Sequence, residues 1–186
     1  MPSEKRPVFV DPRHLQDRSK PGCPQFLLQP PEEIREHLRY DEDTGQFWWI
    51  KRARRRVLSR PAGARSHGYI SIRFEGRGYL GHRLAWWFVH GFVPPCEIDH
   101  INRDRSDNRI ANLRTATRQQ NSANASLAAN NTSGHRGVSL NKKSGLWVAM
   151  IRVDGKQINL GEYPTRQEAA AVYRGASKIA WGAYAA

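Results

Sequence analysis

The amino-acid sequence predicts an α+β protein that is divided into two modules. Short runs of aromatic and β-branched residues are separated by turn signals, which is typical of small antiparallel sheets. Apolar residues recur at helical spacing after the first group of runs and again near the end of the chain, which predicts a buried helix in each module. The stretch between the two groups, residues 121–133, reads NSANASLAANNTS and carries no charge. This composition indicates a helix end followed by a linker, so we place the module boundary near residue 130.

The 186 residues include 30 Lys and Arg against 17 Asp and Glu, which gives a formal net charge of +13. Residues 1–50 hold 7 basic and 9 acidic side chains, residues 51–127 hold 15 and 5, and residues 128–186 hold 8 and 3. The positive charge therefore lies in the two modules and indicates a polyanionic partner. Because 39% of the chain is hydrophobic, with six each of Trp, Tyr and Phe, we expect packed cores and little disorder.

Several other classes of protein are disfavoured. The densest apolar run, residues 84–89, is far shorter than the roughly 20 residues that cross a bilayer, and no amphipathic basic helix favours binding to an acidic membrane surface. The N-terminus lacks the apolar core of a signal peptide, so we expect a cytoplasmic protein. Cys23 and Cys96 are too few for a disulfide framework and too far apart for a zinc ribbon. We expect two reduced thiols and no structural zinc.

Residues 1–37 are predicted to form an N-terminal arm with one short helix. The arm is irregular before Pro31 because its charges are scattered and it has no clear periodicity. From Pro31 to Tyr40, Pro occupies the first turn, Glu residues follow, and Ile34 and Leu38 lie four positions apart. This pattern predicts a helix with one apolar face.

Two strands and a buried helix are predicted next. Residues 47–50 (FWWI) and 69–74 (YISIRF) are rich in aromatic and β-branched residues, and the second run ends at a Glu75–Gly76 turn. Residues 82–91 (HRLAWWFVHG) have apolar residues at helical spacing and end with a glycine, which suits a helix C-terminus.

Six basic residues lie between Lys51 and Arg60. A segment of this kind is consistent with a solvated loop and, in so basic a chain, equally with contacts to a nucleic-acid backbone. The candidates for these contacts are Arg54, Arg55 and Arg56.

The second module is predicted to be a three-stranded antiparallel sheet packed on one helix. Asp154–Gly155 is a strong hairpin signal, and residues 141–145 (NKKSG) supply the other turn. Thr165 and Glu168 form a Thr-x-x-Glu capping box at the start of the helix. The expected strands cover residues 138–140, 146–152 and 156–161.

Residues 97–121 (EIDHINRDRSDNRIANLRTATRQQN) contain a set of side chains that are suited to metal binding and to acid–base catalysis. Hydrolysis of a phosphodiester needs an oxygen ligand for a divalent cation and a base for the attacking water. Asp99 and His100 supply these two groups if the strand that carries them ends or bends there, because adjacent strand residues point to opposite faces. Each residue type alone is more often a turn former or a cap, so the prediction rests on the combination.

This segment resembles the HNH endonuclease family, in the phage and intron-associated branch where the last histidine is replaced by asparagine. Asn112 lies twelve residues after His100 and Asn121 lies twenty-one after it, within a frame of Asp-His, a polar loop and Asn-Leu-Arg. The resemblance covers residues 38–127. Members of the family often have Gly at the position of Arg103, and Asn at that of Asp107, so the loop departs from the family pattern.

The resemblance implies a ββα-metal fold that holds one divalent ion, Mg²⁺ or Mn²⁺. His100 would be the general base, and Asp99 and Asn121 would bind the metal. Asn112 would brace the loop and hold His100 in the tautomer that accepts a proton. Around this set, His82 is expected to pack under the site, Asn108 to be structural, and Arg83 and Arg114 either to contact phosphate or to form salt bridges.

Residues 134–183 resemble the Apetala-type DNA-binding domain of plant ethylene-response factors, which is also found appended to phage HNH nucleases. The resemblance is carried by HRGV at residues 135–138, by NLG at 159–161 and by EAAAVY at 168–173. It implies that the sheet lies in the major groove, where Arg bonds guanine edges. Arg136, Trp147 and Arg152 would contact DNA there, with Trp147 equally consistent with a core aromatic, and Lys142, Lys143 and Lys156 would contact phosphates.

Together these patterns predict a metal-dependent DNA endonuclease, similar to free-standing phage homing endonucleases, that nicks or cuts double-stranded DNA in a bacterial or phage-infected cell. We expect a monomer or a homodimer. Its parts would be an arm (1–37), an HNH domain (38–127), a linker (128–133) and a DNA-binding domain (134–186) that raises the local concentration of the nuclease at its target. The alternative is a non-catalytic, sequence-specific DNA-binding regulator that keeps the HNH fold as a scaffold.

Overall fold

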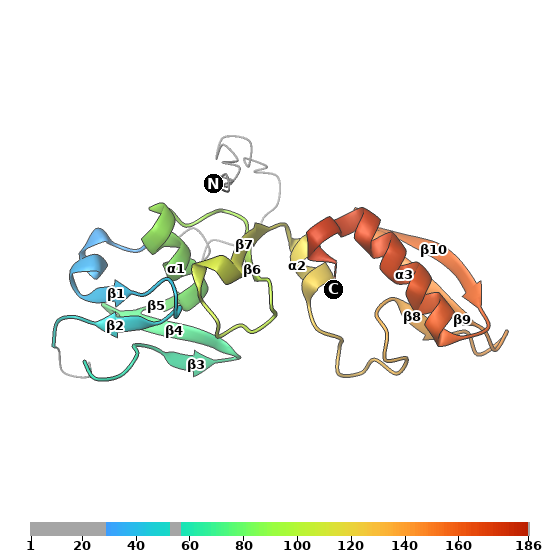
Figure 1. Ribbon diagram of the computed structural model, residues 1–186, viewed down its shortest axis with the longest axis horizontal. Helices are drawn as coiled ribbons and strands as arrows, with labels where there is room; N and C mark the ends of the chain where they lie inside the picture. Colours follow the sequence, from blue (N-terminus) through green and yellow to red (C-terminus); the bar gives the residue numbers. More distant parts are fainter. Residues whose placement is uncertain (1–28, 53–56, 186) are drawn as a thin grey trace, which may run out of the picture.

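The computed structural model describes residues 29–52 and 57–185, so Cys23, Arg54, Arg55 and Arg56 lie outside the described residues. The buried hydrophobic residues form two separate cores, one within residues 34–113 and one within residues 138–173, and the parts of the chain around them are called the first and the second module. Figure 1 shows the two modules side by side, each with its own small sheets and helices. The prediction of a mixed α+β protein is confirmed. Within the described ranges, no helix combines the length and the hydropathy that crossing a membrane requires.

The segment predicted as one helix, residues 31–40, is instead a short 3-10 helix followed by a strand. The 3-10 helix η3 (Glu32–Glu36) ends early, and β1 (Leu38–Tyr40) pairs antiparallel with β2 (Phe47–Trp49). Ile34 and Leu38 are both buried, as the predicted apolar face requires, but Leu38 is buried as part of a strand that pairs with β2.

A three-stranded sheet and a helix complete the body of the first module. Strands β3 (Ala64–Ser66), β4 (Tyr69–Phe74) and β5 (Arg77–Leu80) are antiparallel neighbours in that order. Helix α1 (Gly81–His90) follows directly and ends at Gly91, whose φ of 78° only glycine adopts easily. The predicted strand at 69–74 and the predicted helix are therefore confirmed. The core of this module includes Ile34, Leu38, Phe47, Ile72, Phe74, Leu84 and Trp87.

A hairpin and a short helix form the side of the first module that faces the second. Strand β6 (Glu97–His100) pairs antiparallel with β7 (Leu113–Ala116), and the single-turn 3-10 helix η4 (Ile110–Asn112) precedes β7. Helix α2 (Arg118–Asn124) begins at a capping box in which the Thr117 and Gln120 side chains exchange backbone hydrogen bonds. This order of strand, strand and helix carries the candidate site.

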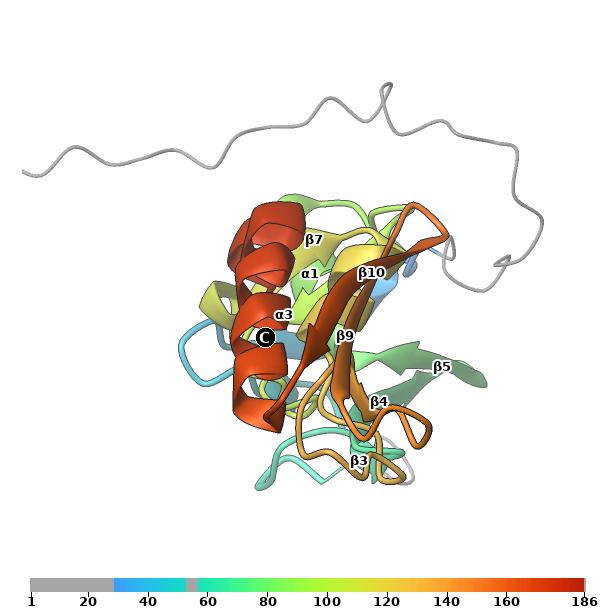
Figure 2. The ribbon, with the colours of Figure 1, turned by 90° about the vertical axis from the view of Figure 1, so that its right-hand side faces the viewer.

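The second module has the predicted three-stranded sheet with one helix. Strands β8 (Val138–Leu140), β9 (Trp147–Val153) and β10 (Lys156–Tyr163) are antiparallel, with β9 in the centre. Helix α3 (Arg166–Trp181) begins where the Thr165 hydroxyl accepts a hydrogen bond from the Glu168 amide, and it covers one face of the sheet (Figure 2). The chain ends in the short 3-10 helix η5 (Gly182–Tyr184), close to α2 (Figure 1).

Candidate active site

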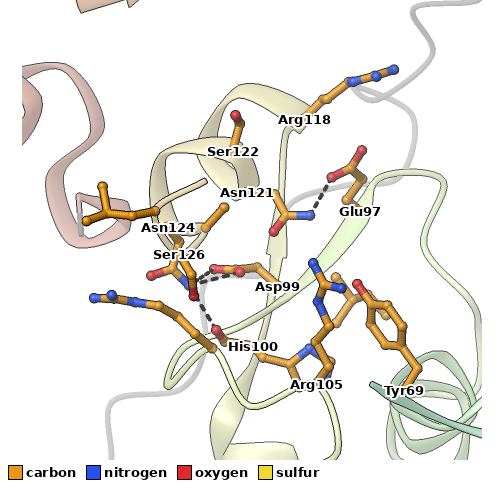
Figure 3. Close-up of a pocket in the computed structure, with 14 residues that line it drawn as sticks. Tyr69, Glu97, Asp99, His100, Arg105, Arg118, Asn121, Ser122, Asn124 and Ser126 are labelled. Carbon is orange, nitrogen blue, oxygen red and sulfur yellow. Dashed lines mark hydrogen bonds between the residues drawn. The ribbon is translucent and has the colours of Figure 1, made fainter. Parts of the chain in front are cut away.

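Strand β6 ends at His100. Asp99 and His100 can share one site only if the strand ends or bends there, because adjacent strand residues point to opposite faces. The Arg103 amide donates to the His100 carbonyl over 2.9 Å, and Arg103 has a φ of 67°, so the chain reverses at this point. Asp99 and His100 are buried, with 4% and 5% of each residue exposed. Both line a pocket of about 620 Å³ that also contains Asn121 from α2 (Figure 3).

The amide of Asn121 is oriented by a carboxylate of the neighbouring strand. Asn121 Nδ2 donates to Glu97 Oε2 over 2.5 Å. Because an ionised carboxylate only accepts hydrogen bonds, this contact fixes the nitrogen on the Glu97 side. The amide oxygen is turned toward Asp99 (Figure 3).

The Asp99 carboxylate is held by two side chains. Arg114 donates to Oδ2 from Nε over 2.8 Å and forms an ion pair from Nη2 at 2.7 Å. Asn124 Nδ2 lies 3.0 Å from both carboxylate oxygens and donates to the His100 carbonyl over 2.8 Å. Within the described ranges, Oδ1 has no partner other than Asn124, so it retains capacity to accept another ligand.

Asp99 and Asn121 fit a hard divalent cation. They bring a carboxylate oxygen and an amide oxygen to one side of the pocket, and oxygen is the ligand type that Mg²⁺ binds. Mg²⁺ is commonly held by one or two carboxylates together with water and substrate phosphate, so a set of two protein ligands is sufficient. The part of the chain that the structure describes contains no group of three or more His, Cys, Asp or Glu arranged for a metal.

His100 is positioned to act as a base. Its Nε2 lies 3.3 Å from Asn108 Oδ1. An oxygen acceptor at this nitrogen favours the tautomer protonated on Nε2 and leaves Nδ1 as the acceptor. Burial lowers the pKa of His100, and the hydrogen bond that its ring donates to Asn108 and the charge of Asp99 partly oppose this effect. The imidazole is therefore neutral near pH 7.

The two asparagines of the loop share the two tasks that were predicted for Asn112 alone. Asn112 braces the loop, since its side chain bonds the Asn102 amide, the Asn102 side chain and the Asp107 carbonyl over 2.9–3.0 Å. The expected contact from Asn112 to the His100 ring is made by Asn108 instead. Asn108 is 1% exposed, and its carbonyl accepts a 2.7 Å hydrogen bond from the Tyr40 hydroxyl.

Three further predicted neighbours of the site are structural. His82 packs beneath it with its ring centroid 5.1 Å from that of His100, and burial lowers the pKa of His82 to about 3. Arg83 donates to the carbonyls of Pro94 and Cys96 over 2.6 and 3.2 Å. Arg114 is engaged by Asp99, so of the two outcomes expected for it the salt bridge is observed.

Several residues of the pocket were not predicted from the sequence. Arg103, Arg105 and Arg118 line it and give it positive charge. Two supporting residues had a recognisable signal, because Glu97 lies two positions from Asp99 on the same strand face and Asn124 lies three positions from Asn121 on the same helix face.

In the second module, Trp147 and Arg152 lie on opposite faces of the sheet. Trp147 packs against the core formed with α3, on the same side of β9 as Ala149 and Ile151. Arg152 is exposed on the other face, with Gln157 as its cross-strand neighbour. The packing of Trp147 favours the second of the two roles considered for it, that of a core aromatic, and its contact with DNA stays a prediction.

The other basic candidates of the second module do not form one surface. Arg136 donates to the backbone carbonyls of Ser122, Ala125 and Ser126, so it faces α2 and not the open side of the sheet. The exposed Lys142 and Lys143 lie in the turn between β8 and β9, whereas Lys156 lies beside the β9–β10 turn at the opposite end of the sheet.

Comparisons with known proteins identify the family. A model of the HNH endonuclease family matches residues 79–123. Protein 3.8 of Escherichia phage T7 is 32% identical over 94 residues, which cover 50% of this chain and 78% of the phage protein. An uncharacterized HNH endonuclease of Acanthamoeba polyphaga mimivirus is 34% identical over 120 residues, which cover 64% of this chain and 62% of the viral protein. No solved structure matches the chain significantly. The chain therefore belongs to the HNH endonuclease family and carries its HNH domain at residues 79–123.

Proposed function

We propose that this protein is a divalent-metal-dependent DNA endonuclease of the phage homing type. Membership of the HNH family supports DNA hydrolysis. The observation that carries the proposal is the pocket of about 620 Å³ in which Asp99, His100 and Asn121 converge from β6 and α2. A base, two oxygen ligands and a basic surround are the groups that phosphodiester hydrolysis needs.

Each residue of the pocket has a defined role in this proposal. Asp99 Oδ1 and the Asn121 amide oxygen would hold one Mg²⁺ or Mn²⁺ ion, which supplies stabilisation of the leaving 3′-oxygen when bound. His100 accepts a proton from the attacking water at Nδ1, because Asn108 occupies Nε2. Asn112 keeps the loop closed, and the arginines of the pocket attract the scissile phosphate.

We further propose that the second module, residues 134–186, binds double-stranded DNA through the open face of its sheet. This role follows the Apetala-type resemblance and the excess of basic residues in this part of the chain. Arg152 is the side chain best placed to contact a base, since it is exposed and projects from the central strand. Lys142, Lys143 and Lys156 would contact phosphates at the two ends of the sheet.

The decisive test is cleavage of supercoiled plasmid and phage DNA with Mg²⁺, Mn²⁺ or EDTA. The wild type is expected to give nicked or linear product only with metal, and His100→Ala and Asn121→Ala are expected to abolish it while DNA binding persists. His90→Ala is a matched control, because His90 is an exposed histidine at the other end of α1 from the site. If the wild type binds DNA and cuts neither substrate with any metal, the non-catalytic regulator becomes the better account.

A further inference from the structure

The last residues of the chain contact the first module at β7. The Ala183 carbonyl accepts a 2.8 Å hydrogen bond from Arg114 Nη1. The guanidinium of Arg114 lies 3.9 Å from the centre of the Tyr184 ring, and the Tyr184 hydroxyl donates to the Thr115 carbonyl over 2.7 Å. Helix η5 is thereby fastened to β7 by two hydrogen bonds and one cation–π contact.

The same guanidinium holds the Asp99 carboxylate. Nε and Nη2 of Arg114 face Asp99 Oδ2, and Nη1 faces Ala183. Arginine is rigid and planar, so fixing one side of the group fixes the direction of the other. Asp99 Oδ2 is therefore held by a side chain whose position depends on the C-terminal turn, whereas Oδ1 is bonded by Asn124 and not by Arg114.

Helix α2 is held by the second module as well. Arg136 donates to three carbonyls at the C-terminal end of α2, where a positive charge also interacts favourably with the helix dipole. An isolated helix of seven residues is not stable in water, so α2 needs such external contacts. Asn121 and Asn124, which complete the site around Asp99, both lie on this helix.

We propose that Tyr184 is a positioning residue of the nuclease centre, which acts through Arg114 to hold Asp99 in the orientation that binds the metal. This inference rests on the proposed function. It gives the second module a role beyond that of a tether, because part of it supports the site of the first module. Groups that orient a metal-binding carboxylate typically change metal affinity by about 10- to 100-fold when they are lost.

The test measures Mn²⁺ binding to the 186-residue chain without DNA, by calorimetry or by electron paramagnetic resonance. Tyr184→Ala removes both the ring and the hydroxyl and is expected to weaken Mn²⁺ binding by about tenfold. Tyr184→Phe keeps the ring over Arg114 and is expected to lose less. Tyr163→Phe is the matched control, because the Tyr163 hydroxyl also donates to a carbonyl over 2.7 Å, but to Leu160 within the second module.

Two control measurements separate positioning from unfolding or loss of DNA binding. Circular dichroism should show the same fold for all variants, and DNA affinity in EDTA should stay within about twofold of wild type. If Tyr184→Ala binds Mn²⁺ as tightly as wild type, the inference is wrong and the proposed nuclease stands. If the wild type binds no Mn²⁺ and does not cut DNA, the proposed function fails and the inference fails with it.

Discussion

Replacing Gly81 with alanine should damage the site from a position outside it. Gly81 is the first residue of α1, and a Cβ built there would lie 2.7 Å from Asn108 Nδ2 and 3.2 Å from Ile70 Cβ. Asn108 is 1% exposed and its carbonyl is held by Tyr40, so its amide has little room to retreat. The added methyl group should therefore turn this amide away from His100.

The expected magnitudes follow from the competing effects. Helix propensity favours alanine over glycine by up to about 1 kcal/mol. Overpacking at a buried site costs about 1–3 kcal/mol, so the variant should be less stable than wild type by up to about 2 kcal/mol. Loss of the hydrogen bond to His100, worth about 1 kcal/mol, should slow cleavage by about fivefold.

Gly175→Ala is the matched control for this prediction. Gly175 lies within α3, and a Cβ there would meet nothing within 4 Å. This variant should gain about 0.5–1 kcal/mol of stability and cleave at the wild-type rate. Urea unfolding gives the free energies, and the rate of plasmid nicking gives the activity. The packing argument is refuted if Gly81→Ala matches Gly175→Ala in both measurements.

Three other predictions concern pH, salt and the second module. Burial lowers the pKa of His82 from 6.5 to about 3, so His82 stays neutral in the folded state at pH 5. The unfolded chain binds a proton there below pH 6.5, so acidification to pH 5 should cost about 2 kcal/mol of stability. His82→Gln should make the urea-unfolding free energy depend less on pH; an unchanged slope would contradict this. Arg118→Ala should make the plot of log DNA-binding constant against log salt concentration less steep by about 0.9. Arg77→Ala, which lies outside the pocket, should leave the slope unchanged. Trp147→Ala should lose about 3 kcal/mol of stability, whereas Arg152→Ala should keep the wild-type stability and bind DNA more weakly. The assignment of the two faces would be contradicted if both variants weakened DNA binding equally and neither lost stability.

Local signals predicted much of the fold. The end of α1 at Gly91 and the start of α3 at Thr165 depend on backbone conformations and caps that one or two residues determine. The strand at 69–74 and the three strands of the second module were found for the same reason, since their turns are encoded next to them.

Pairing between two neighbouring strands explains the main error in the fold. Residues 31–40 have a helical pattern, but their last three residues form β1, which pairs with β2 across the short turn at residues 41–46, and this pairing outweighs the helical pattern. The face of Trp147 could have been predicted, because residues two apart in a strand share a face. Trp147 therefore lies on the side of Ala149 and Ile151, and Arg152 lies on the other side. Arg136 could not, since its partners are carbonyls of α2 in the other module.

The spacing of the site residues predicted which side chains would meet, but not how they would be held. Asp99, His100 and Asn121 share one pocket, although their catalytic roles remain predictions. The asparagine at the His100 ring was assigned to Asn112, and Asn108 makes the contact instead. Both lie in the same loop, four residues apart, so only the packing of the loop against Tyr40 and α1 distinguishes them.

The HNH match ends at residue 123, so it contains the candidate site residues but not all the residues that hold them in place. It includes Asp99, His100 and Asn121, but it excludes Asn124, which bonds both Asp99 and the His100 carbonyl. It also excludes Tyr184, which contacts Arg114 from the C-terminal turn. A helix as short as α2 is not stable through its own local contacts. The second module contacts both β7 and α2, so we expect DNA binding by that module and the geometry of the site to be physically linked.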